Sequence, residues 1–179
     1  MRWSVILLAL VLAGCTTKMG KDGRTESSVD VKYLAKSEVD RVADATRSEV
    51  MDGLMLIADK LYKRNPKEWK KAGLASREQA LERLRNRFYR SLPELAGQRE
   101  GQAAALAFSE VYSGDRVAAL MLGLLTMVDA AFEHRAEFFL LDSLNEQKLF
   151  NCARNMEVAV WKLGNDRNAA GELYLLSNA

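Results

Sequence analysis

The sequence has few of the residues that interrupt helices and few of those that cross-link chains. Only two of its 179 residues are proline, Pro66 and Pro93, and only two are cysteine, Cys15 and Cys152. Hydrophobic residues make up 49% of the chain. A chain with few prolines and many strong helix formers favours long helices. The composition therefore predicts an all-α protein, a single bundle-like domain of five or six helices.

Residues that carry enzyme chemistry are equally scarce. His134 is the single histidine, so neither the H-E-x-x-H pattern of zinc enzymes nor the paired E-x-x-H pattern of di-iron bundles can be completed. The sequence also lacks a G-x-S-x-G nucleophile elbow, a glycine-rich phosphate loop and a C-x-x-C pair. These absences predict a non-catalytic protein with no metal and no cofactor.

Hydrophobic runs are present but short. Residues 5–13 and 117–128 carry no charge, and both runs fall short of the roughly 20 residues that a membrane-spanning helix needs. Arg2 precedes the first run, and Leu12-Ala13-Gly14-Cys15 ends it. A charged start, a short apolar run and a cysteine directly after Leu-Ala-Gly together resemble the signal peptide and lipobox of bacterial lipoprotein precursors.

The resemblance implies that residues 1–14 are cleaved as a signal peptide and that Cys15 carries a diacylglycerol. Its lipid would anchor the mature protein to a membrane that the chain does not span. Residues 15–28 have two glycines and no apolar period, so we expect a flexible tether, followed by a helical domain over 29–179. In enterobacterial lipoproteins an aspartate after the cysteine favours the inner (cytoplasmic) membrane. Thr16 stands there instead, which favours the periplasmic leaflet of the outer membrane, a compartment without nucleic acid.

Cys152 is the one cysteine that lipidation would leave as a thiol, so no disulfide can form within the mature chain. Leu149, Met156 and Leu163 share its helical face. This spacing predicts a buried, inert thiol.

Apolar spacing and capping signals place the helices. The longest is expected to begin near Ser37 and to end before Asn65-Pro66, with Val39, Val42 and Leu54 on its inward stripe and its second half more deeply buried. Asp40, Asp44 and Arg47 lie off that stripe, and we expect them in water. Further helices are expected from Ser76 to before Pro93 and over residues 98–112, 117–139, 143–163 and 168–176, with 117–128 buried at the centre and Asp129 leaving the core.

The charge is concentrated in the middle of the chain. Residues 60–90 contain 11 basic and 3 acidic residues, and Arg83, Arg87 and Arg90 recur at helical spacing. Two interpretations remain open for this stripe. The arginines pair with acidic residues elsewhere in the domain, or they form a docking surface for an anionic partner.

Four polar residues form a candidate buried cluster: His134, Arg135, Asn151 and Asn155. Helical phase places Arg135 on the apolar stripe of Leu120 and Leu124, where it would either need a carboxylate or extend its guanidinium to solvent. Asn151 and Asn155 lie one turn apart, and they either bond a neighbouring backbone or line a small polar pocket. His134 is interpreted as a surface histidine or a partly satisfied structural one.

These features predict a lipid-anchored, non-catalytic accessory or scaffold protein that faces the periplasm and docks to a cell-envelope complex. The alternative is a carrier of a small ligand or lipid, which would need a pocket between the 117–128 helix and the 143–163 helix. A third interpretation, an enzyme, would need His134, Arg135 and a carboxylate to converge in an open cleft. No feature of the sequence sets an oligomeric state.

Overall fold

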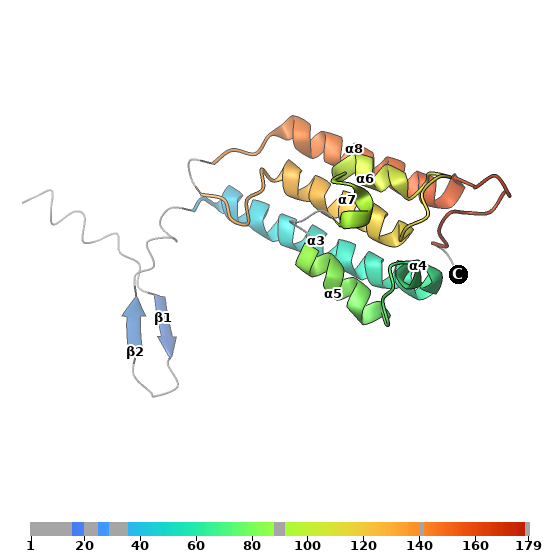
Figure 1. Cartoon of the computed structure of the whole chain (residues 1–179). Helices are drawn as coiled ribbons and strands as arrows, with labels where there is room; N and C mark the ends of the chain where they lie inside the picture. The colour runs from blue at the N-terminus through green and yellow to red at the C-terminus, as the bar shows by residue number, and fades with distance from the viewer. Residues whose placement is uncertain (1–15, 20–24, 29–35, 88–91, 140–141, 178–179) are drawn as a thin grey trace, which may run out of the picture.

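The computed structural model describes residues 16–19, 25–28, 36–87, 92–139 and 142–177. Its helices confirm the all-α prediction, with six α-helices in the described ranges (Figure 1). They are α3 (Glu38–Arg64), α4 (Pro66–Lys71), α5 (Arg77–Arg87), α6 (Glu100–Leu106), α7 (Arg116–Ala131) and α8 (Glu146–Asn165), with a 3₁₀ turn, η1, at Pro93–Leu95.

A small hairpin lies in the segment that we expected to be a flexible tether. β1 (Thr16–Met19) pairs antiparallel with β2 (Thr25–Ser28), and Thr16 lies opposite Ser28. The tether prediction was based on the lack of an apolar period in this segment. Backbone hydrogen bonds join the two strands, and a pattern of side-chain hydrophobicity does not detect such bonds.

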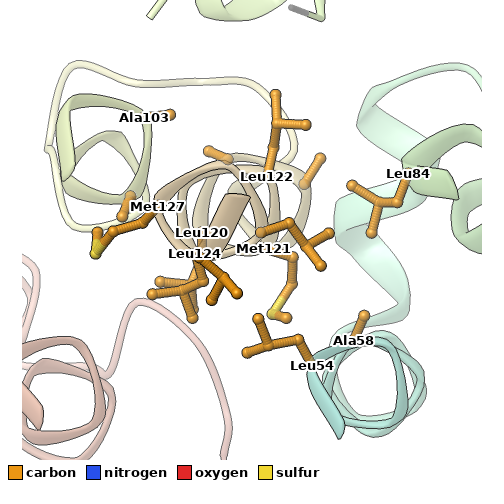
Figure 2. Close-up of a cluster of buried hydrophobic side chains, with 14 of the residues drawn as sticks. Leu54, Ala58, Leu84, Ala103, Leu120, Met121, Leu122, Leu124 and Met127 are labelled. Atoms are coloured by element: carbon orange, nitrogen blue, oxygen red, sulfur yellow. The ribbon is translucent and has the colours of Figure 1, made fainter. Parts of the chain in front are cut away.

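α7 is the centre of the domain, as the uncharged 117–128 stretch predicted. All of its residues except Arg116 and Ala130 are buried. Figure 2 shows α7 side chains surrounded by Leu54 and Ala58 of α3, Leu84 of α5 and Ala103 of α6. α4 and α8 also contact α7. A helix that is apolar on every side is stable only when other elements cover it completely.

The prediction that this helix continues to residue 139 is wrong. α7 ends at Ala131, and Glu133 and His134 take left-handed backbone angles, with φ of 56° and 57°. The His134 N–H donates to the carbonyl oxygen of Asp129 at 2.8 Å, which closes the turn. Asp129, which we expected in water, is buried inside the domain.

α3 confirms the expected start and the expected gradient of burial. The Ser37 hydroxyl accepts the Asp40 N–H while the Asp40 carboxylate accepts the Ser37 N–H, a complete capping box. The second half buries Leu54, Ala58, Leu61 and Tyr62.

The first half of α3 is turned differently from our prediction. Val39 and Val42 are 74% and 64% exposed, whereas Asp40 is buried. The Asp44 carboxylate accepts the Phe138 N–H at 2.8 Å, and Arg47 is paired with buried Asp129. The free energy gained from these polar contacts exceeds the free energy that burial of the two valines would contribute. The polar contacts therefore fix the rotation of the helix.

The expected helix over 168–176 is absent. The Asn168 side chain accepts the N–H groups of Ala170 and Glu172, and Gly171 has φ of 79°. An asparagine that bonds the backbone just ahead of it offers an alternative to helix. Arg167 and Leu173 instead form an isolated bridge, and Leu175 is buried in the core.

Asp115 joins α7 to α3. As the N-cap of α7, its carboxylate accepts the Ala118 N–H at 2.8 Å and the Tyr62 hydroxyl at 2.9 Å. Burial raises the pKa of Asp115 to about 6, since removal from water penalises the charged form. Burial also raises the pKa of Tyr62, so its hydroxyl remains a donor.

The closest helix contact supplies a test of the packing around α7. A Cβ at Gly123 would lie 2.5 Å from the Ala104 nitrogen and 2.6 Å from the Glu100 carbonyl oxygen. Gly123→Ala should therefore lower the free energy of unfolding by about 1–3 kcal/mol, because both obstacles are backbone atoms of α6. Urea denaturation measures the change.

Gly53→Ala is the matched control, because a Cβ at this helical position meets nothing within 4 Å. The control should gain up to about 1 kcal/mol, the ordinary difference between alanine and glycine in a helix. Equal effects of the two substitutions would contradict the close packing of α6 on α7.

Candidate functional site

Asp129 forms the polar centre of the domain at the end of α7. Its carboxylate accepts from the Arg47 guanidinium at 3.0 Å and contacts the His134 Nδ1 at 2.7 Å. Asp129 is buried and Arg47 nearly so, whereas the His134 side chain is 64% exposed. The carboxylate therefore orients the imidazole and leaves Nε2 as the ring nitrogen available to a ligand.

His134 lies at the edge of a groove between α7 and α8, which we call the α7–α8 groove. The groove has a volume of about 410 Å³. Its walls are formed by Glu100, Met127, Ala130, Ala131, His134, Lys148, Asn151, Cys152 and Asn155. Three of the four predicted polar cluster residues, His134, Asn151 and Asn155, thus come together.

The prediction that this cluster is buried is wrong, because all four of its side chains are exposed. Arg135 is also separate from the other three. It pairs with Asp142, one of the partners that its sequence position suggested, and lies in a different surface depression. The reason is the turn after α7, which removes Arg135 from the helical phase on which its inward position was predicted. The convergence of His134, Arg135 and a carboxylate, which the enzyme interpretation needed, is incomplete.

A second, more apolar hollow adjoins the α7–α8 groove, and we call the two together the combined groove. A hollow of about 150 Å³ shares Met127 and Asn155 with the α7–α8 groove. Its other walls are Gly101, Ala104, Ala105, Phe108, Val158, Ala159 and Lys162, from α6, the segment after it and α8. One end of the combined groove is therefore polar and the other is hydrophobic.

Cys152 is buried, as predicted. Burial raises the pKa of its thiol, and the negative charge of Glu100 raises it further. The thiol therefore remains protonated at neutral pH, the form that is a poor nucleophile. In the part of the chain that the structure describes, no group of three or more His, Cys, Asp and Glu side chains could hold a metal ion.

The predicted arginine stripe is not an open surface at Arg83. Its guanidinium donates to Glu94 at 2.8 Å, and both side chains are partly buried. Arg87 is the last residue of α5, and Arg90 lies outside the described residues. At Arg83 the structure thus supports internal pairing over docking.

A different part of the 60–90 segment carries the surplus positive charge. Lys60, Arg64, Lys67 and Lys70, at the end of α3 and on α4, form no ion pair with any described residue. We call this group the basic corner. By contrast, the neighbouring Lys63 and Lys71 pair with Asp59 and Glu68. The charge count along the sequence located the segment, whereas helical spacing singled out Arg83, which is paired with Glu94.

The predicted lipidation residue, Cys15, lies outside the described residues, and lipidation stays a prediction. Within the described ranges, the search for a helix of sufficient length and hydropathy to span a membrane finds none.

Asp129 should contribute far more to stability than its histidine partner. Asp129→Ala leaves the Arg47 guanidinium buried without a countercharge, and the free energy of unfolding should fall by about 3–5 kcal/mol. His134→Ala removes an exposed imidazole and leaves the Asp129–Arg47 pair in place, so it should cost less than about 1 kcal/mol. Urea denaturation at pH 7 measures both variants, and similar losses in the two would contradict this assignment.

Comparison of the chain with protein-family models, with curated proteins and with solved structures finds no match.

Proposed function

We propose that the protein is a lipid-anchored, non-catalytic accessory protein of the bacterial cell envelope, and that it docks through the basic corner onto an acidic protein surface of an envelope complex. The observation that carries this proposal is the surplus charge of the basic corner. Lys60, Lys67 and Lys70 are exposed, and no described acid neutralises them. Most other described cations of the 60–90 segment are already paired within the domain.

The length of α3 favours a protein partner over the anchoring bilayer. The described part of the helical domain begins at α3, and the basic corner lies at the opposite end of this helix (Figure 1). A helix of 27 residues spans about 40 Å at 1.5 Å per residue. The basic corner is thus well separated from the end of the domain that the lipid would hold.

Charges of this kind act mainly on recognition and on the rate of association. An exposed ion pair contributes only about 0–1 kcal/mol, but a cluster of like charges steers an oppositely charged partner toward one face. We therefore expect a complex that weakens as salt concentration rises, since salt screens exposed charges.

Charge reversal tests the docking assignment. The double variant Lys67→Glu/Lys70→Glu should lose most cross-links to the envelope partner when the intact lipidated protein is cross-linked in its native membranes and analysed by mass spectrometry. The matched control is Arg41→Glu/Lys148→Glu, which makes the same change in net charge on exposed residues at the starts of α3 and α8, at the opposite end of the domain from the basic corner (Figure 1). The control should keep its cross-links, and both variants should keep the wild-type melting temperature within a few degrees.

Two outcomes would reject this assignment. One is unchanged cross-linking in the Lys67→Glu/Lys70→Glu variant. The other is a wild-type protein whose basic corner cross-links only to lipid, which would make the bilayer the partner. A Cys15→Ala variant tests the lipid anchor. It should lose its attachment to the membrane and, as a result, its cross-links to the partner.

A second candidate function is that of a carrier for a single-chain amphiphile, because the structure has a groove where the carrier interpretation required one. The apolar section between α6 and α8 suits an acyl chain, and the section with His134, Asn151 and Asn155 suits a polar headgroup.

A bulky side chain in the apolar section tests the carrier function. Ala105→Trp should weaken the binding of a fluorescent fatty acid at least about tenfold, a change of about 1.4 kcal/mol, because the indole fills the groove. Ala45→Trp, on the exposed surface of α3, is the control and should bind like wild type. Absence of binding to the wild-type protein, or equal binding to all three proteins, would reject the carrier function.

A further inference from the structure

The outer face of α8 carries an uncovered stripe that neither proposed function uses. Phe150 and Trp161 are 65% and 60% exposed, and Arg154 and Glu157 lie between them on the same side of the helix. Their spacing places the four residues in one row, opposite the core-facing Cys152 and Ala159. α8 lies along one edge of the domain, so no described helix covers this row (Figure 1).

The row is complementary to itself when it is reversed. Phe150 and Trp161 are equally far from the midpoint of the row, which lies between residues 155 and 156. Arg154 and Glu157 are also equally far from that midpoint. Two copies of α8 laid antiparallel about this point would place Phe150 opposite Trp161 and Arg154 opposite Glu157 of the other copy. A parallel pair would instead place each charge opposite its like.

From this pattern we propose that the protein forms a two-fold symmetric homodimer through antiparallel pairing of α8. A two-fold interface uses the same surface of both subunits, so every contact occurs twice. Each half of the interface would hold one aromatic contact and one ion pair. In the single chain, the Arg154 Nη1 donates to the Glu157 Oε2 at 2.7 Å. On dimerisation, each Arg154 would exchange the Glu157 of its own chain for the Glu157 of the second copy.

The composition of the row favours a second copy over other occupants. Tryptophan, phenylalanine and arginine are enriched at protein interfaces. An anionic bilayer would attract a surplus of cations, but Arg154 and Glu157 cancel each other. The exposed apolar residues of α3 lack this symmetry, because Thr46, Glu49 and Gly53 separate Val42 from Ile57 on its outer face.

Charge exchange tests the pairing in the full-length, lipidated protein in detergent, with the subunit number measured by light scattering on a sizing column and by analytical ultracentrifugation. The wild-type protein should be a dimer. Arg154→Glu places acids opposite acids, and Glu157→Arg places bases opposite bases. Each single variant should therefore raise the dimer dissociation constant at least about tenfold.

Two complementations identify the antiparallel register. The double variant Arg154→Glu/Glu157→Arg should dimerise within about threefold of wild type, because it restores both ion pairs in reverse. The two single variants, mixed, should form a heterodimer, because each row of one sign then meets a row of the other sign. Trp161→Ala should weaken the dimer, whereas the control Leu56→Ala, an exposed apolar residue on α3, should not.

All of these residues are exposed, so circular dichroism should show unchanged folding in every variant. A monomeric wild-type protein would overturn the proposal. A dimer that survives both single charge reversals and Trp161→Ala would overturn it as well, because it would have to use another surface.

Discussion

The architecture depends on one constraint, which is that residues 117–129 of α7 are all buried. Its apolar residues satisfy this constraint by contact with the surrounding helices, but its polar side chains need partners from other elements. Asp115 accepts the Tyr62 hydroxyl of α3. Thr126 accepts the Glu100 N–H at the start of α6. Asp129 accepts the Arg47 guanidinium. Because each of these contacts satisfies a group that would otherwise be buried alone, they determine where α3 and α6 lie against α7 and how α3 is rotated.

The candidate site follows from the same contacts. Asp129 binds the side chain of Arg47 and both the ring and the backbone N–H of His134, so the chain must leave α7 in a tight left-handed turn. The turn ends α7 and brings the imidazole to the edge of the α7–α8 groove. A helix extended through this point would have carried His134 and Arg135 onward in helical phase. The buried carboxylate thus produces the polar end of the groove and separates Arg135 from it.

Local sequence signals predicted most of the helices, whereas the choice of buried face needed the structure. The helix start near Ser37, the Ser76 cap and the uncharged 117–128 stretch depend on neighbours within a few residues, and all three were identified. The burial of Asp129 depends on Arg47, a partner distant in sequence, and a hydrophobicity pattern assigns Asp129 to water. For the same reason spacing alone selected Arg83 for docking, since its partner Glu94 lies beyond the helix. No sequence pattern predicted the surface groove. The carrier interpretation only required that a pocket exist between α7 and α8.

The charges of the two unpartnered surfaces determine what each surface can recognise. In a two-fold interface each surface meets a symmetry-related copy of itself, so charged groups pair favourably only when the surface places each charge opposite one of the other sign. The outer row of α8 meets this condition through Arg154 and Glu157. The basic corner cannot meet it, because its four cations would face four cations of a second copy. Repulsion of this kind rejects a wrong partner as effectively as attraction selects the right one. We therefore propose different partners for the two surfaces, the chain itself for the outer row of α8 and an acidic protein for the basic corner.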